Sequence, residues 1–164
     1  MEGRITRDNV FPLVVILDNL RSAFNVGSIF RTSECLGIES IILCGYTSTP
    51  EDSQTSKAAM GMDKIMPWKW MKTVEEAIAE MKARNYTVVA LETVVGCPDI
   101  SSFSFPRTGC ALVLGNERYG IDSSHVSLCD AVVKIPCRGI KNSLNVASAY
   151  GICAYEITRQ WSTS

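Results

Sequence analysis

The regular alternation of short strand-like runs with helical patterns limits this chain to very few folds. Five runs are rich in β-branched and other apolar residues, and each is followed by turn or helix-capping residues. They are Leu13–Leu17, Ser40–Cys44, Thr87–Leu91, Ala111–Leu114 and Val132–Ile135. Because parallel strands need long and usually helical connections, this order predicts an α/β fold, with a mostly parallel sheet covered by helices on both faces.

The segments between and after these runs supply the helices. Thr73 is a suitable N-cap for a helix that carries apolar residues at helical spacing as far as Met81. The segment Ser143–Gln160 has one apolar face with small residues between, which predicts a long helix that a second helix can approach closely. Trp68 and Trp70 alternate as in a strand. Two segments are predicted as loops: Tyr46–Gly61 and Val95–Thr108.

Size and charge indicate one domain that spans residues 1–164. A chain of 164 residues with 46% hydrophobic and 20% charged residues can bury one core but not two. Its formal net charge of −1 argues against a strongly basic surface. Any contact with nucleic acid must therefore come from a local cluster or from a second subunit.

The seven cysteines are widely spaced, form no CxxC pair and are accompanied by a single histidine. This pattern predicts reduced, mostly buried thiols and no bound metal. The first nine residues are polar, and no apolar run approaches the roughly 18 residues that span a bilayer. We therefore expect a soluble cytoplasmic protein without a membrane partner.

A first candidate site segment, Asn25–Arg31, follows the first strand through a polar turn. Asn25 is a good N-cap and Gly27 allows close backbone approach, so the segment is expected to open a helix near the carboxyl edge of the sheet. Open α/β sheets place their ligands at this edge. The alternative interpretation is an ordinary capped helix with a surface arginine, Arg31.

A second candidate segment begins where the strand Ala111–Leu114 runs into Gly115, Asn116 and Glu117. Glycine frees the backbone to contact a ligand, and two polar side chains project from the strand end. The segment is not a GxGxxG fingerprint and lacks a Walker lysine, which disfavours dinucleotide and NTPase sites. A plain tight turn with solvated side chains is the alternative.

A third candidate segment follows the strand that ends near Pro136. A loop with Arg138 leads to Asn142, Ser143 and Asn145, which crowd the start of the last helix. Capping that helix needs only one of these three polar residues. The surplus indicates a binding or catalytic site.

Together these segments resemble the SpoU, or TrmH-like, family of SPOUT RNA methyltransferases over nearly the whole chain. The first family motif is met by Asn25, Gly27, Ile29, Arg31 and Gly37, and the second by Gly115, Asn116 and Glu117. The third is met by Ile135, Pro136, Ser143, Leu144, Asn145, Arg159 and Gln160. Arg118, Tyr119 and Gly120 depart from the commoner continuation of the second motif, which affects how that loop meets a ligand.

The resemblance implies an α/β knot, with the carboxyl-terminal portion threaded into a trefoil, which pattern reasoning alone would never propose. It also implies S-adenosylmethionine as cofactor and a homodimer that completes an RNA site. The implied cofactor-binding residues are Leu91, Glu92, Gly115, Asn116, Ile135, Ser143 and Leu144. Arg4, Arg7, Arg21, Arg138 and Lys141 from two chains are candidates for one basic RNA groove.

The implied reaction is methyl transfer to a ribose 2′-hydroxyl of RNA, and the implied catalytic residues are Arg31, Asn25, Glu117, Ser143 and Asn145. A guanidinium keeps its proton, so we expect Arg31 to bind phosphate and stabilise the developing alkoxide rather than to act as base. His125 is predicted to be a partly exposed helical histidine without an acidic partner.

Transfer RNA is the preferred substrate class, with a D-loop guanosine as the target. The alternatives are ribosomal RNA, a base rather than a ribose as target, and a module that binds RNA or nucleotide but has lost catalysis. The intact set of candidate catalytic residues argues against that loss. An oxidoreductase of the Rossmann type would need a glycine-rich turn after the first strand, which Asp18–Ser22 does not supply.

Overall fold

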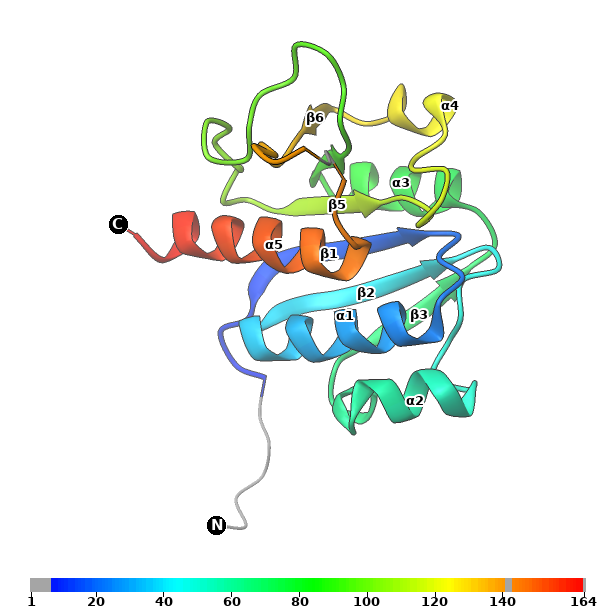
Figure 1. Ribbon diagram of the computed structural model, residues 1–164. Helices are drawn as coiled ribbons and strands as arrows, with labels where there is room; N and C mark the ends of the chain where they lie inside the picture. Colours follow the sequence, from blue (N-terminus) through cyan, green and yellow to red (C-terminus); the bar gives the residue numbers. More distant parts are fainter. Residues whose placement is uncertain (1–6, 141–142, 164) are drawn as a thin grey trace.

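The computed structural model describes residues 7–140 and 143–163, and its centre is a six-stranded sheet in which every paired strand runs parallel (Figure 1). The strand order is β3-β2-β1-β5-β4-β6. In chain order the strands are β1 (Phe11–Asp18), β2 (Ile38–Cys44), β3 (Trp68–Met71), β4 (Thr87–Leu91), β5 (Cys110–Leu114) and β6 (Ala131–Val133). This confirms the predicted α/β class and the parallel sheet.

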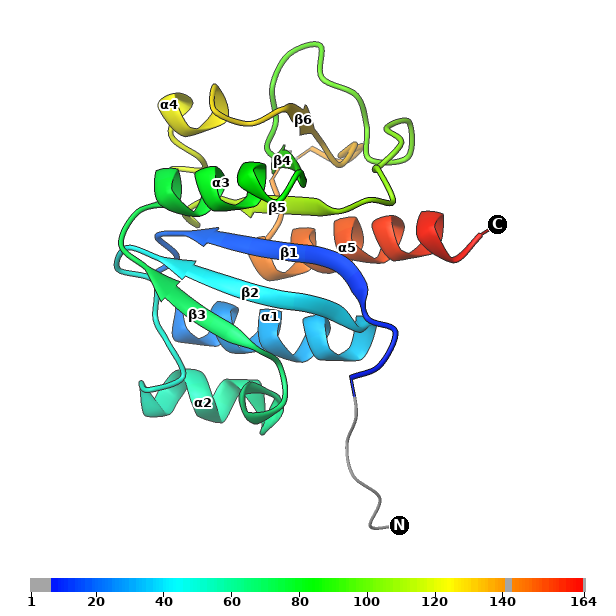
Figure 2. The ribbon, with the colours of Figure 1, turned by 180° about the vertical axis from the view of Figure 1, so that it is seen from behind.

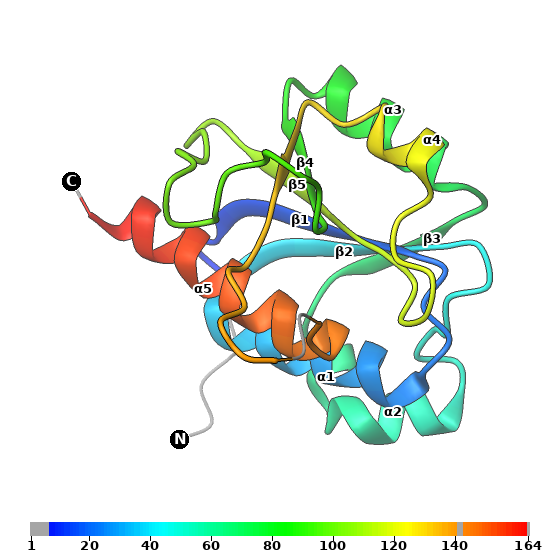
Figure 3. The ribbon, with the colours of Figure 1, turned by 45° about the horizontal axis from the view of Figure 1, so that its top comes forward.

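Helices cover both faces of the sheet, as predicted (Figures 2 and 3). They are α1 (Ala23–Leu36), α2 (Ser53–Ala59), α3 (Val74–Ala83), α4 (Ser123–Val126) and α5 (Val146–Ser162), with a short 3-10 helix, η1, at Met62–Lys64. In β1, consecutive residues such as Val15 and Ile16 belong to different core clusters and are both fully buried. One cluster includes α1 and α5, and the other includes α3. Within the described ranges, no helix is long and apolar enough to cross a membrane.

The predicted strands are confirmed with small changes at their ends. At its carboxyl end β6 stops at Val133, two residues earlier than predicted, so Ile135 lies outside it. The cause is a change of partner at Lys134, which donates its N–H to Pro98 and accepts one from Ile100. The chain therefore leaves β4 here and pairs with the loop that follows β4.

The segment Tyr46–Gly61, predicted to be a loop, contains α2. Its sequence SQTSKAA has no apolar period to reveal a helix, and the helix depends on tertiary packing. A Cβ added at Gly27 of α1 would lie 2.4 Å from the Cβ of Ala58, so the missing side chain lets the two helices approach. Asp52 caps α2 by accepting the N–H of Gln54.

The loop between β4 and β5 is tied to the end of α5. Gln160 donates to the carbonyl of Phe103 and accepts the N–H of Phe105, at 2.9 and 3.1 Å. Arg107 donates to the carbonyls of Gln160, Trp161 and Thr163. The polar end of the third motif therefore holds a loop against the last helix. The trefoil knot itself stays a prediction.

All seven cysteines are free. Cys44, Cys110 and Cys153 are buried, whereas Cys35 and Cys137 are exposed and the other two are half-buried. Burial raises the pKa of Cys44 and of Cys153 to about 12 each, which keeps these thiols protonated and unreactive. The prediction of mostly buried thiols is therefore correct for only three of them.

Candidate functional site

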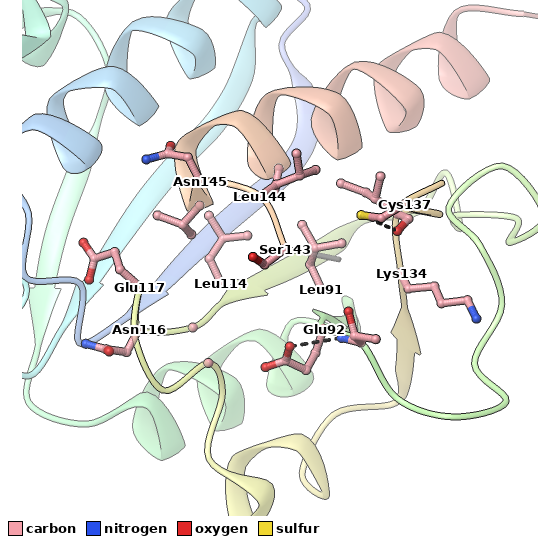
Figure 4. A pocket seen from close by; sticks show the side chains of 16 residues that line it. Leu91, Glu92, Leu114, Asn116, Glu117, Lys134, Cys137, Ser143, Leu144 and Asn145 are labelled. Carbon is pink, nitrogen blue, oxygen red and sulfur yellow. Dashed lines mark hydrogen bonds between the residues drawn. The ribbon is translucent and has the colours of Figure 1, made fainter. Parts of the chain in front are cut away.

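A pocket of about 370 Å³ lies where β4 and β5 end and α5 begins (Figure 4). All the residues predicted to bind cofactor line it: Leu91, Glu92, Gly115, Asn116, Ile135, Ser143 and Leu144. Three segments far apart in the sequence meet here because the carboxyl ends of parallel strands share one edge of the sheet. The lining combines aliphatic side chains, such as Leu91 and Leu114, with polar ones, such as Glu92 and Ser143, that can orient a ligand.

One wall of the pocket depends on a tight turn from Gly115 to Gly120. Asn116 and Gly120 exchange backbone hydrogen bonds of 3.1 and 2.9 Å. A Cβ on Gly115 would lie 2.3 Å from the carbonyl carbon of Gly120, so the turn requires glycine at this position. Gly120 itself has φ of 70° and faces the carboxylate of Glu92, which accepts the N–H of Ile121 at 2.8 Å.

The side chain of Asn116 is fully used inside the protein. Its amide donates to the carbonyl of Asn19 at 2.8 Å and to the phenol of Tyr46 at 2.9 Å. Its oxygen accepts the N–H groups of Arg118 and Tyr119 at 2.8 and 3.0 Å. These four bonds account for the whole capacity of the amide, so this side chain holds the pocket wall in shape.

Glu117, labelled in Figure 4, is held by donors from the turn before α1 and from the first motif. Its oxygens accept the backbone N–H groups of Arg21 and Ser22, both at 2.9 Å, and the amide of Asn25 at 3.2 Å. Partial burial opposes ionisation, but these hydrogen bonds together hold the pKa of Glu117 below its ordinary value. Glu117 is therefore a carboxylate at neutral pH and a poor proton acceptor.

Asn145 connects the third motif to the first. Its amide donates to Asn25 at 3.1 Å, and its oxygen caps α5 by accepting the N–H groups of Ala147 and Ser148. The three motifs are thus joined by one chain of hydrogen bonds, Glu117 to Asn25 to Asn145. The predicted capping role of Asn25 is wrong, because Ser22 caps α1 and Asn25 lies within its first turn. That position frees Asn25 for the two side-chain contacts.

A family model confirms what these motifs suggest. The model of the SpoU rRNA methylase family matches residues 12–155. The chain belongs to the SpoU methylase family.

Two curated relatives and one solved structure illustrate this likeness. The 23S rRNA (guanosine-2'-O-)-methyltransferase RlmB of Pseudomonas aeruginosa is 27% identical over 161 residues, which cover 98% of this chain and 64% of the relative. The tRNA (guanosine(18)-2'-O)-methyltransferase TARBP1 of Mus musculus is 29% identical over 93% of this chain and 10% of its own length. The AdoMet-bound rRNA methyltransferase from Sinorhizobium meliloti has a TM-score of 0.85 and 32% identity, covering 96% of this chain and 60% of that one. The chain thus spans less than two thirds of each.

Arg31, the predicted catalytic arginine of the SpoU motif, lies away from the pocket. It is exposed in a second hollow formed by α1 and α5, whose lining includes Thr32, Gly151 and Tyr155. Arg31 lies six positions after Asn25, so the two side chains leave α1 in different directions. Within one chain, the structure therefore brings together Asn25, Glu117, Ser143 and Asn145, but not Arg31.

The residues predicted to bind RNA fall into separate groups. Arg21 is exposed next to Glu117, and Arg138 is exposed in the loop after β6. Arg7 lies at the amino edge of the sheet, where its guanidinium donates to the carbonyls of Ile38 and Glu39. Arg4 and Lys141 lie outside the described residues.

His125 has acidic partners, so that part of the sequence prediction is wrong. Its Nδ1 lies 2.8 Å from buried Asp18 and its Nε2 lies 3.3 Å from Glu75. Burial lowers the histidine pKa, but the two carboxylates outweigh it and the pKa is raised. No sequence spacing indicates this cluster, because it joins β1, α3 and α4 across the fold.

Among residues 7–140 and 143–163, no group of three or more His, Cys, Asp or Glu residues is arranged to hold a metal ion.

Proposed function

We propose that this chain transfers a methyl group from S-adenosylmethionine to a ribose 2′-hydroxyl of RNA, with a guanosine of transfer RNA as the preferred target. The observation that carries the proposal is the hydrogen-bonded chain Glu117–Asn25–Asn145, which borders the pocket. It unites one residue from each of the three motifs. Residues 1–164 would form the catalytic unit, working in a reducing compartment such as the cytoplasm.

The pocket suits the proposed cofactor. Leu91, Leu114, Ile135 and Leu144 offer an apolar lining for the adenine and the thioether chain. Glu92 and Ser143 offer groups for ribose hydroxyls and amino groups. When bound, S-adenosylmethionine supplies an electrophilic methyl group. The glycine turn and Asn116 keep the wall rigid, which helps hold a bent ligand in one conformation.

The residues beside the pocket position the nucleophile. Glu117 is ionised but already accepts three hydrogen bonds, so it orients Asn25 instead of removing a proton. Asn25 and Asn145 then present fixed amide groups to the ribose. Arg31 binds the adjacent phosphate and stabilises charge on the developing alkoxide.

A homodimer would bring Arg31 to a pocket. Large apolar side chains of α1 and α5, including Phe24, Ile152 and Tyr155, are exposed in one chain. A surface of this kind is commonly covered by a partner. We propose that α1 and α5 pack against a second copy, so that Arg31 of one chain completes the pocket of the other.

Transfer RNA is preferred because the Asn116–Arg118, Ser143–Asn145 and Arg159–Gln160 combination resembles that branch of the family most. The mouse relative, whose name includes a tRNA guanosine, supports this choice. Ribosomal RNA is the second candidate, supported by the Pseudomonas and Sinorhizobium relatives. The target nucleoside in both curated names is guanosine.

The test is to incubate the protein with labelled S-adenosylmethionine and unmodified pools of transfer and ribosomal RNA, and then to digest the RNA and identify the product. A 2′-O-methylguanosine from transfer RNA is expected. The same product from ribosomal RNA alone would select the second candidate, and a methylated base would contradict ribose chemistry.

Arg31→Lys tests the role of the guanidinium. It should bind S-adenosylmethionine as tightly as the wild type but lose most of the rate, because an ammonium cannot form a bidentate contact with phosphate. Calorimetry gives the cofactor affinity and a single-turnover assay gives the rate. A variant that retains its turnover would contradict the bidentate contact.

A further inference from the structure

A second surface lies beside the pocket, at the carboxyl ends of β2 and β5. Tyr46 and Tyr119 are 59% and 77% exposed. Arg21 lies 5.8 Å from the ring centre of Tyr46, and Arg118 lies 5.6 Å from that of Tyr119. These four residues are called the aromatic rim below. Large exposed rings next to a ligand pocket are costly to leave in water and suit a flat, polar partner.

The two arginines of the aromatic rim have no ion pair among the described residues. The nearby carboxylate of Glu117 accepts the backbone N–H of Arg21 and leaves its guanidinium free. Both side chains are exposed. Their charges are thus available to an external anion such as a phosphodiester.

The rim is held in place by the residue that shapes the pocket. Asn116 donates to the phenol oxygen of Tyr46 and accepts the N–H of Tyr119. The N–H of Tyr46 is also fixed, by Asn19 at 2.9 Å. The Tyr46 ring, anchored at its hydroxyl, loses little freedom when a ligand stacks on it, and the backbone of Tyr119 is fixed beside it. The same amide therefore connects the rim to the pocket wall.

The amino edge of the sheet carries another arginine–tyrosine pair, but this pair is already bound by a carboxylate of the protein. Arg84 lies 4.5 Å from the ring centre of Tyr86, but both side chains are bound by Glu39, at 2.6 and 2.5 Å. That pair is neutralised within the protein. An arginine beside a tyrosine is thus not enough to make a binding surface, and the rim differs because its cations are unpaired.

We propose that the aromatic rim binds unpaired RNA bases next to the target nucleotide, with the tyrosine rings stacking on the bases and Arg21 and Arg118 contacting phosphates. This inference rests on the proposed function and narrows it, because the target ribose must then lie in a single-stranded loop or bulge. Bases in a duplex stack on each other and cannot reach the rings, whereas unpaired bases can.

The test is the affinity for a single-stranded 12-nucleotide oligoadenylate and for a 12-base-pair RNA duplex, measured by fluorescence anisotropy. The wild type should prefer the single strand. In the double variant Tyr46→Leu/Tyr119→Leu, the affinity for the single strand should fall roughly 5- to 150-fold for each ring removed, which is the typical contribution of one stacked base. Tyr119→Phe, which keeps its ring and leaves the bond between Asn116 and the Tyr46 hydroxyl in place, should stay within about twofold of the wild type. In Arg21→Gln/Arg118→Gln, the slope of log affinity against log salt concentration should become shallower by the amount expected for the loss of about two phosphate contacts.

Two controls separate outcomes. Arg84→Gln changes the matched pair at the amino edge and should leave the oligoadenylate affinity unchanged. Unaltered S-adenosylmethionine affinity in the leucine variant shows that the pocket is intact. If the wild type prefers the duplex, or if the leucine variant binds oligoadenylate normally, the proposal that the aromatic rim binds unpaired bases is wrong. Absence of methyl transfer by the wild type to any RNA overturns the proposed function instead, since the rim is measured by binding alone.

Discussion

The two edges of the sheet use the same residue types in opposite ways. At the amino edge, Arg84 is bound by Glu39, and Arg7 and Arg107 donate to backbone carbonyls. At the carboxyl edge, Glu117 is bound by backbone N–H groups, and the guanidinium of Arg21 stays free. The arginines at the amino edge close the fold, whereas the guanidinium of Arg21 at the carboxyl edge is left for a ligand.

Backbone geometry explains the difference. The carboxyl ends of parallel strands lead into the amino ends of helices, whose first N–H groups are free to bind a carboxylate. The carboxylate of Glu117 accepts the backbone N–H groups of Arg21 and Ser22, just before α1. It therefore needs no arginine side chain to balance its charge. Helix carboxyl ends meet the other edge, and their free carbonyls bind arginines, as Arg107 shows at α5. The edges should therefore respond differently to mutation.

The largest effect is expected at the carboxyl edge, from Glu117→Gln. With its amide nitrogen in place of Oε2, the glutamine would face the N–H of Ser22 and the amide of Asn25 donor to donor and would release Asn25. With the nitrogen in place of Oε1, it would face the N–H of Arg21 in the same way. We expect the rate of methyl transfer to fall about 100-fold, as for loss of a positioned polar group in other active sites, with a change in unfolding free energy of only about 1 kcal/mol.

Single-turnover kinetics on the RNA pool that the wild type methylates, together with urea unfolding, measure the two effects of Glu117→Gln. Asn116→Ala is not a suitable control, because it would alter both pocket and rim. Glu51→Gln, an exposed carboxylate in the loop before α2, is suitable and should have no effect on the rate. A loss of unfolding free energy well above about 1 kcal/mol in Glu117→Gln would contradict the idea that the carboxyl edge serves the reaction and not the stability of the fold.

Arg107→Ala tests the amino edge and should lower the stability without changing the rate. It removes the hydrogen bonds from Arg107 to the last carbonyls of α5 and loosens the loop between β4 and β5. Because these carbonyls can turn to water, the expected loss of unfolding free energy is about 1 kcal/mol. The single-turnover rate should be unchanged. Arg159→Ala, which breaks only a surface pair with Glu156, is the matched control.

Much of the sheet, but less of the site, could be predicted from the sequence. The strand runs and the helix after Thr73 were visible because apolar periodicity is a local property. The helix α2 was not, since its residues lack that period and it forms against Gly27. The roles of Asn116 and His125 were also hidden, because their partners lie far away in the chain. The family resemblance predicted Asn25, Glu117 and Asn145 as site residues, but only the fold revealed that Asn25 is hydrogen-bonded to both of the others.

His125 offers an intermediate case, since it lies at the carboxyl edge but is satisfied internally by Asp18 and Glu75. Its pKa is raised in the folded protein above the ordinary value of 6.5. The contribution of protonated His125 to the stability of the fold is therefore fully present below about pH 6.5 and is lost as the pH rises through the folded-state pKa of His125. Urea unfolding of His125→Gln and of the wild type should give a difference that shrinks between pH 6 and pH 9. A difference that stays constant over this range would show that the histidine acts through packing alone.

The smallest effect is expected from Arg84→Gln, and it gives the sharpest comparison with the aromatic rim. Arg84 is substantially exposed and its ion pair with Glu39 is screened by water, so the loss of unfolding free energy should be only about 0.2–1 kcal/mol. Urea unfolding measures this loss at two salt concentrations, and the loss should be smaller at high salt. RNA affinity and methyl-transfer rate should both equal those of the wild type, because Glu39 already binds the guanidinium. A clear drop in RNA affinity would mean that RNA reaches the amino edge as well. The unpaired charges of Arg21 and Arg118 would then no longer explain why one edge binds RNA and the other does not.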